Sequence, residues 1–270
     1  GKQPTQSAVM IKRQNHDGGV NSTPFYAAIR VVDSGGHADI LAVEFDEGVH
    51  AVKRPKQYST SSRNTLKPVQ RELNFFKKAL EHENIISCLG FCWVNLTPGC
   101  IIMPLLKESL FDRINSRDGL VGLELFDLAK QLLCSLDFLH THGIAHLDLK
   151  AENVMLEQVG DKTVAKLIDF GLFSEVTERE GSTRGSVDYV SPEMFALPFN
   201  EVDVCQSDMW SLAVVLFAMI HQEIIGKILL RKLKRVLVAD LLTTQLDKSV
   251  TSAVVHFVKE PDTRAMCHYL

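Results

Sequence analysis

The sequence predicts an α+β fold in which a small antiparallel sheet with one helix precedes a larger, mostly helical part. Between residues 25 and 106, short β-rich segments alternate in polarity and are separated by Gly, Pro and Asp turn residues. After residue 107, apolar residues recur at helical spacing over longer stretches. We therefore expect an extension at 1–24 and one domain at 25–270, divided into a first lobe with its connecting hinge (25–106) and a second lobe (107–270).

The first lobe is expected to hold five strands and one helix. The helix is marked by Leu73, Phe76 and Leu80 on one stripe, and turns are marked by Asp33-Ser34-Gly35-Gly36 and by a Pro-Gly pair. The strands are predicted at 26–32, 40–45, 50–53, 86–94 and 100–106, and the helix at 69–80.

The second lobe is predicted from helical apolar spacing. A long amphipathic helix is expected over 125–139 and ends near Gly143, since glycine commonly ends helices. The apolar run 212–220 is too short to span a bilayer and is expected to be a core helix. A short helix at 109–114 and a helical mixture at 225–242 complete this lobe.

The composition of the chain limits the classes of partner that it could bind. The chain has 270 residues with 46% apolar content, enough for a full core, and its net charge of -4 provides no basic field for nucleic acid or an anionic membrane. The six cysteines contain no C-x-x-C pair, which indicates reduced, buried thiols and argues against a metal site of cysteines. We expect no membrane span and a cytoplasmic location; a removed leader and secretion stay open, as does the oligomeric state.

The stretch 146–155 concentrates the chemistry of the chain. Asp148, Lys150 and Asn153 place a carboxylate, an ammonium and a carboxamide within six positions. Phosphoryl transfer needs an acceptor for the proton of the attacking hydroxyl, a cation beside the transferred group and an oxygen ligand for Mg²⁺. These three residues could supply them, although an ordinary loop with a buried His146 is the alternative for this stretch alone.

The stretch 146–153 resembles the protein-kinase catalytic loop, and Asp169-Phe170-Gly171 matches the D-F-G motif of that family at the expected distance. The resemblance implies a two-lobed kinase fold with ATP between the lobes. It implies that Asp148 orients and deprotonates the substrate hydroxyl and that Lys150 steadies the γ-phosphoryl group. It further implies that Asn153 and Asp169 hold Mg²⁺.

The resemblance also assigns ATP-positioning residues. Ala51-Val52-Lys53 resembles the strand whose lysine meets the α and β phosphates, and Glu72 resembles its helical partner. The alternatives are a Lys53 that reaches water at a strand end and an exposed Glu72 that pairs with Lys77 or Lys78. Further nucleotide contacts are expected from Gly35, Ile40, Ala51, Met103, Pro104, Leu106 and Met155.

The glycine-rich loop of the family is degenerate here, because only Gly35 survives while Asp33 and Ala38 stand at the other two glycine positions. An Asp near the phosphates repels them, so nucleotide binding is expected to be weak. This erosion motivates the alternative of a pseudokinase-like binding or scaffold module with weak or no turnover. The survival of the catalytic, lysine and metal positions favours an active enzyme.

The remaining motifs favour a serine/threonine protein kinase that acts on a protein substrate with a Ser or Thr acceptor. Ser186 stands where such kinases place a residue that bonds the catalytic Asp and Lys. The stretch 189–193 resembles the A-P-E motif and 208–213 resembles D-x-W-S-L-G. Leu147 replaces the arginine of H-R-D, so activity is expected not to need phosphorylation at Ser182 or Thr183.

Overall fold

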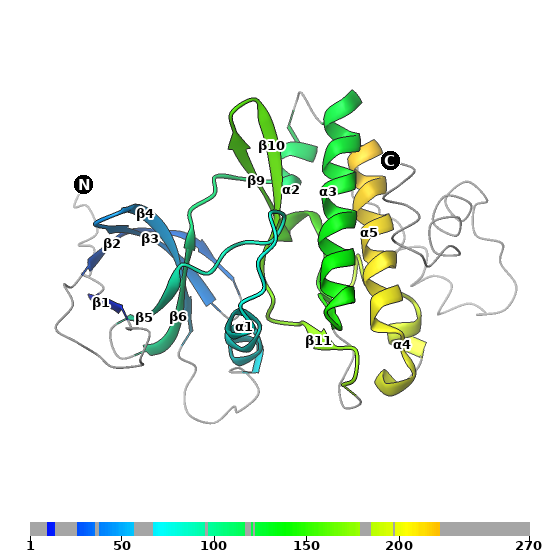
Figure 1. The fold of residues 1–270 in the computed structure, drawn as a ribbon, viewed down its shortest axis with the longest axis horizontal. Coiled ribbons are helices and arrows are strands. Elements are labelled where there is room, and N and C mark those ends of the chain that lie inside the picture. The colour runs from blue at the N-terminus through cyan, green and yellow to red at the C-terminus, as the bar shows by residue number, and fades with distance from the viewer. Residues whose placement is uncertain are drawn as a thin grey trace, which may run out of the picture. The chain divides into compact units, whose positions relative to one another are not determined.

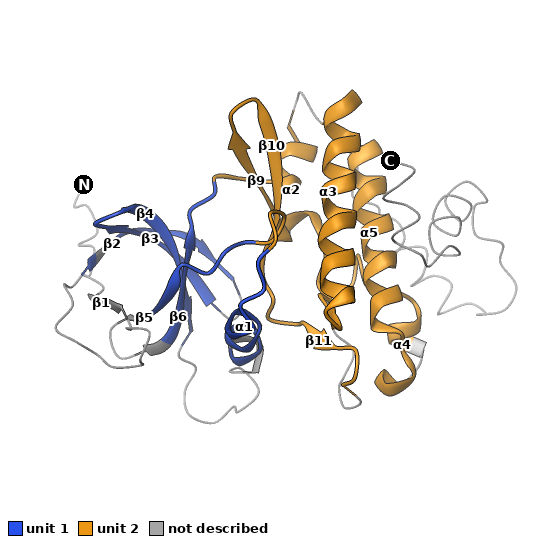
Figure 2. Ribbon diagram, in the orientation of Figure 1, with its two compact units in different colours: residues 1–81, 86–106 blue, residues 82–85, 107–270 orange. Residues whose placement is uncertain are grey.

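The computed structural model of the chain describes residues 10–13, 26–35, 38–56, 67–94, 97–116, 120, 122–178, 185–196 and 198–221. It divides into two compact units, Gly1–Glu81 with Ile86–Leu106 and His82–Ile85 with Lys107–Leu270 (Figure 2). The predicted α+β class is confirmed. The limits proposed for the extension and the domain stay predictions.

The first unit is built on an antiparallel barrel closed in the order β1-β2-β3-β4-β6-β5 (Figure 1). Side chains alternate between the inside and the outside of a strand, and β3 follows this rule with Val43 and Phe45 buried around the exposed Glu44. The strands are β1 (Met10–Arg13), β2 (Tyr26–Ser34), β3 (Ala38–Phe45), β4 (Gly48–Pro55), β5 (Gly90–Val94) and β6 (Thr97–Pro104).

Strand β1 was not expected, because its four residues are too few for a periodic signal to emerge from a polar stretch. It pairs with both β2 and β5 and so closes the sheet. Strand β5 begins at Gly90 rather than at residue 86. The preceding Ile85 forms a parallel bridge with Leu167 and does not pair with the barrel.

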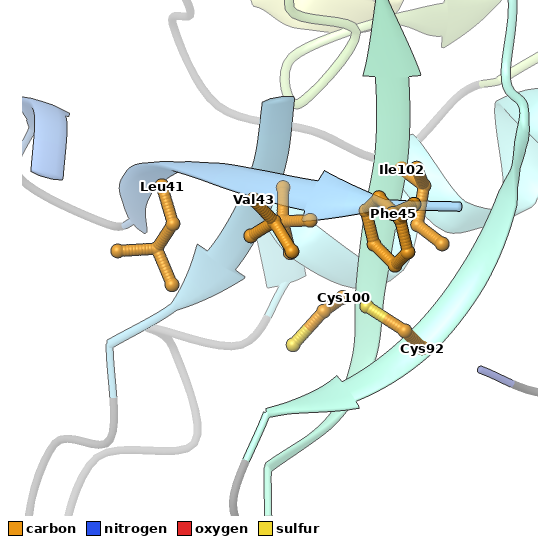
Figure 3. Packing of buried hydrophobic residues seen from close by; sticks show 7 residues of the cluster. Leu41, Val43, Phe45, Cys92, Cys100 and Ile102 are labelled. Atoms are coloured by element: carbon orange, nitrogen blue, oxygen red, sulfur yellow. The ribbon is translucent and has the colours of Figure 1, made fainter. Parts of the chain in front are cut away.

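The core of the barrel consists of apolar side chains from several of its strands. The cluster joins strands β3, β4, β5 and β6, and Figure 3 shows its members between the strands. It contains Leu41, Val43, Phe45, Val52, Cys92, Cys100 and Ile102, all nearly or fully buried. Helix α1 (Lys67–Lys77) contacts β6 and buries Phe75. It ends before residue 80 because Ala79 has a φ of 52°, a left-handed conformation that cannot continue the helix.

The largest described elements of the second unit are two helices, α3 (Gly122–Thr141) and α5 (Val204–His221), which lie side by side (Figure 1). Leu128, Leu132 and Leu136 are buried along α3, as the predicted stripe requires. Gly143, with a φ of 70°, follows the end of α3 in the left-handed conformation that glycine adopts without strain.

The other described elements of the second unit are short. Helix α2 begins after Ser109, whose side chain forms a capping box with Asp112. The other elements are α2 (Leu110–Ile114), α4 (Glu193–Ala196), the 3₁₀ turns η1 (Ala151–Asn153) and η2 (Phe199–Glu201), and the strands β7 (Glu108–Ser109), β8 (Ile144–Ala145), β9 (Val154–Val159), β10 (Lys162–Leu167) and β11 (Ser174–Glu175).

The helical mixture predicted at 225–242 lies outside the described residues. In the part of the chain that the structure describes, no helix combines the length and the apolarity needed to cross a bilayer.

Candidate active site

Asp208 binds the backbone at the start of the stretch 146–155. This carboxylate is fully buried on α5, where it accepts hydrogen bonds from the backbone N–H groups of His146 (2.7 Å) and Leu147 (2.8 Å). Nε2 of His140 lies 2.9 Å from the same carboxylate. Leu147 has a φ of 62°, a conformation that costs energy for a leucine and is stabilised here by these hydrogen bonds.

The Asp148 carboxylate is the centre of a compact polar group. Its Oδ1 accepts from the Ser186 backbone N–H (3.0 Å) and hydroxyl (2.8 Å). Its Oδ2 accepts from Lys150 Nζ (2.8 Å) and Asn153 Nδ2 (3.0 Å). Lys150 Nζ also donates to the Ser186 hydroxyl, at 2.8 Å. Four donors therefore fix the orientation of one carboxylate that is 9% exposed.

Asn153 and Asp169 supply oxygen atoms of the kind that Mg²⁺ binds. Nδ2 of Asn153 donates to the Asp148 carbonyl (2.8 Å) and carboxylate, which leaves its carboxamide oxygen for a cation. Ile168 N–H donates to the Asn153 carbonyl at 2.9 Å, so the residue before Asp169 is tied to Asn153. A carboxylate and a carboxamide oxygen are hard ligands that suit Mg²⁺. Among the described residues, no group of three His, Cys, Asp or Glu side chains could hold a metal by itself.

His146 is structural. Its ring is fully buried and lies 4.9 Å from the ring of Phe170. Its Nδ1 accepts from the Asp148 N–H at 3.2 Å and its Nε2 contacts the Ile168 carbonyl at 3.1 Å. One side chain thus links the backbone beside Asp148 to the backbone beside Asp169.

Lys53 and Glu72 meet within the first unit. Lys53 on β4 places Nζ 2.7 Å from the Glu72 carboxylate on α1. Glu72 is 2% exposed and Lys53 is 14% exposed, so neither is the solvated side chain of the alternative interpretation, and Lys77 and Lys78 are exposed.

The other predicted nucleotide contacts lie in both units. In the first unit, Ile40 is the strand partner of Lys53, Ala51 is that of Met103, and both Ala51 and Met103 are buried. Pro104 ends β6, and Leu106 follows it as the last residue of this unit. Met155 lies on β9 in the second unit.

Charged side chains form hydrogen bonds within the β2–β3 hairpin that contains Gly35. Lys56 Nζ donates to the Gly35 carbonyl at 2.6 Å, and Gly35 N–H donates to the Ala38 carbonyl at 3.0 Å. Asp39 accepts from Arg54 (2.8 Å) and Ser34 (2.8 Å). Burial raises the pKa of Asp39, but these hydrogen bonds and the Arg54 charge outweigh it and lower the pKa below its ordinary value. The carboxylate therefore stays ionised and holds the base of the hairpin.

A family model described as a protein kinase domain matches residues 26–259. The chain belongs to the protein kinase family.

Curated relatives of this kinase domain agree with that assignment. MAP kinase-interacting serine/threonine-protein kinase 1 of Xenopus laevis is 30% identical over 183 residues, 63% of this chain and 43% of that protein. Death-associated protein kinase 2 of Homo sapiens is 32% identical over 174 residues, 61% and 45% respectively. A calcium and calcium/calmodulin-dependent serine/threonine-protein kinase of Pisum sativum is 40% identical over 113 residues, 41% and 21% respectively. The chain spans less than half of the length of each.

The segment after the D-F-G motif is anchored by packing in this kinase domain. Leu147 is 4% exposed and belongs to an apolar cluster with Met194 and Phe199. Gly185 has a φ of 105°, and a Cβ on it would lie 2.8 Å from the Leu147 carbonyl oxygen. Ser191, which replaces the Ala of A-P-E, shares a 2.8 Å hydrogen bond with a serine hydroxyl on α5.

Of the three hydroxyl residues at positions 182, 183 and 189, the structure describes only the last. Ser182 and Thr183, the predicted phosphorylatable positions, lie outside the described residues. Tyr189 is buried and its hydroxyl donates to Glu152 at 3.3 Å; burial, and then the Glu152 charge, raise its pKa well above the ordinary range. Tyr189 is therefore a neutral, structural hydroxyl.

The sequence analysis did not predict the anchoring role of Asp208. It also did not predict that the side-chain amides of Asn84 and Gln131 bind the backbone of β10, the strand that precedes Asp169. The sequence carries a signal for Asp208, because this carboxylate lies in a helix that is expected to be buried in the core, where a charge is costly unless it is hydrogen-bonded. Asn84 and Gln131 carry no such signal, since polar residues at turns and on helix surfaces are common.

Proposed function

We propose that this kinase domain transfers the γ-phosphate of ATP to Ser or Thr hydroxyls of protein substrates in an Mg²⁺-dependent reaction. The observation that carries the proposal is the Asp148 carboxylate, oriented by Lys150, Asn153 and Ser186. The serine/threonine class is supported by the contact of Ser186 with both Asp148 and Lys150, and by the names of the relatives.

Each side chain has one task in this proposal. Asp148 accepts the proton of the substrate hydroxyl, and Lys150 places its charge beside the transferred group. Asn153 and Asp169 would hold Mg²⁺, which neutralises the charge that develops on the phosphate oxygens. Lys53, steadied by Glu72, orients the α and β phosphates of ATP.

In this proposal, activity does not require phosphorylation of the segment after the D-F-G motif. The buried Leu147 cannot bind a phosphate, and the segment is held instead by the apolar cluster that Leu147 shares with Met194. The double variant Ser182→Ala, Thr183→Ala is expected to keep peptide turnover within about threefold of the parent. A hundredfold loss that Glu at either position restores would show that a basic residue elsewhere receives a phosphate.

A non-catalytic nucleotide-binding or scaffold module is the second candidate, and the degenerate hairpin favours it. Asp33 is exposed at the end of β2, where a carboxylate repels phosphate. Asp33→Gly with Ala38→Gly is expected to tighten ATP binding in calorimetry, because it removes a negative charge and frees the backbone. Unchanged or weaker binding would show that this hairpin does not cover the phosphates.

The decisive experiment measures transfer of labelled γ-phosphate from ATP to Ser- and Thr-containing peptides, with and without Mg²⁺. Asp148→Asn is expected to lower turnover by at least about a hundredfold while ATP affinity changes little. Asp161→Asn, an exposed carboxylate in the β9–β10 turn, is the matched control and is expected to behave as the parent. Equal turnover of the parent and Asp148→Asn, or transfer by neither, would contradict catalysis by this site.

A further inference from the structure

Among the described residues, no strand pairs with one edge of β10 along most of its length. Its other edge pairs with β9 from Lys162↔Val159 to Leu167↔Val154. The backbone N–H and C=O groups of alternate residues in a strand point to the same edge. The backbone groups of Thr163, Ala165 and Leu167 therefore all face one edge of β10. Buried backbone groups require partners.

Two residues, Gln131 and Asn84, supply these partners. Gln131 on α3 accepts from the Ala165 N–H at 2.8 Å and donates to the Thr163 carbonyl at 3.0 Å. Asn84 donates its Nδ2 to the Ala165 carbonyl at 3.0 Å, and its backbone carbonyl accepts from the Leu167 N–H at 2.8 Å. Four backbone groups on one edge of β10 are therefore satisfied by two residues.

The pattern is that of a parallel strand. A residue in a parallel ladder donates to the carbonyl of one residue and accepts from the N–H two residues further on. Gln131 does this across residues 163 and 165, and Asn84 does it across 165 and 167. A 2.8 Å hydrogen bond from Asn84 Nδ2 to Gln131 Oε1 joins the two amides, and Ile85 continues with a parallel bridge to Leu167.

Gln131 has no spare capacity. Its Nε2 also donates to Asp127 at 2.9 Å, so both hydrogens and both acceptor positions of the amide are used. Asn84 is 2% exposed. An aliphatic residue at 131 would leave the Ala165 N–H, the Thr163 carbonyl and the Asn84 amide without these partners.

We propose that Gln131 is a positioning residue: with Asn84 it forms a surrogate strand that fixes β10 and, through it, Asp169. Asp169 follows the last residue of β10 by two positions, and the intervening Ile168 N–H is bound to the Asn153 carbonyl. The two proposed Mg²⁺ ligands therefore depend on where β10 ends. The consequence for Mg²⁺ rests on the proposed function, whereas the surrogate strand does not.

The test uses Gln131→Leu, which removes all four hydrogen bonds, and Gln131→Glu, which keeps only the two that the oxygen accepts. Gln206→Leu, at an exposed glutamine on α5, is the matched control. Amide hydrogen exchange at Ala165 and Leu167 is measured in each protein. The Mg²⁺ dependence of ATP affinity is measured by calorimetry, so no reading depends on turnover.

Gln131→Leu is expected to speed exchange at Ala165 by about tenfold or more and to raise the Mg²⁺ concentration for half-maximal ATP binding by about tenfold, with Gln206→Leu unchanged. Gln131→Glu, the variant to use if the leucine protein does not fold, is expected to shift both readings in the same direction by about threefold. Unchanged exchange in the folded variants would overturn the surrogate strand. Faster exchange with unchanged Mg²⁺ dependence would overturn its link to Asp169. Absence of phosphoryl transfer by the parent would instead overturn the proposed function and leave both readings valid.

Discussion

The ion pair between Lys53 and Glu72 allows a stability prediction that can be worked from its geometry. At 2.7 Å and an effective dielectric constant of about 20, the attraction is on the order of 6 kcal/mol. Transfer of both groups from water costs several kcal/mol each, so the pair as a whole is expected to contribute little. Removal of only one partner is expected to be costly. The remaining charged side chain, Glu72 at 2% exposure or Lys53 at 14%, would then face an apolar replacement.

A double-mutant cycle with Lys53→Met and Glu72→Leu separates these effects. Lys53→Met alone is expected to lower the free energy of unfolding by about 3–5 kcal/mol, and the double variant to lie within about 1 kcal/mol of the parent. Denaturant titration of the four proteins measures the coupling. Lys166→Met removes a 3.4 Å pair with Glu157 that is 20% and 37% exposed and is expected to cost below about 1 kcal/mol.

Additive effects of the two substitutions, with a coupling below about 0.5 kcal/mol, would refute the reasoning, because they would show that the two charges do not depend on each other in the folded protein. Since Lys53 is also assigned to ATP, Lys53→Met and the double variant are both expected to weaken ATP binding. Restored stability without restored ATP binding would separate the structural role of the pair from its functional role.

Three further predictions concern the second unit. Gly185→Ala is expected to lower turnover at least about tenfold with little change in ATP affinity, because its Cβ would lie 2.8 Å from the Leu147 carbonyl oxygen at a φ of 105°; parent-like kinetics would contradict this. Leu147→Ala is expected to cost about 2–5 kcal/mol in denaturant titration, because the side chain is buried in an apolar cluster, and a cost below about 1 kcal/mol would count against that packing. Arg113→Met is expected to lower the free energy of unfolding at pH 7. The difference in this free energy from the parent should shrink as the pH falls below 4.5, the ordinary pKa of a carboxyl group such as that of Glu108. The Arg113 hydrogen bond lowers the pKa of Glu108 in the folded state, so this stabilisation is present above 4.5 and is lost as that carboxylate is protonated; a difference independent of pH between 7 and 3 would contradict it.

Local patterns were sufficient for the class of fold and for the elements with strong periodicity. The apolar spacing along α3 predicted a helix that the structure extends by only a few residues at each end. Strand β1 could not be predicted, because its residues become a strand only through pairing with β2 and β5. The position of Ile85 was likewise decided by a partner, β10, more than 80 residues away.

The sequence by itself determined which residue types are available for chemistry, because the order and spacing of Lys53, Asp148, Asn153 and Asp169 are local properties of the chain. Only the tertiary structure decided how these side chains are held. Ser186 reaches Asp148 across 38 positions, and the Gln131 amide completes an edge of β10 across more than 30. Such contacts depend on where separate segments meet after folding, and a glutamine on a helix surface has the same appearance in the sequence whether it meets water or a strand.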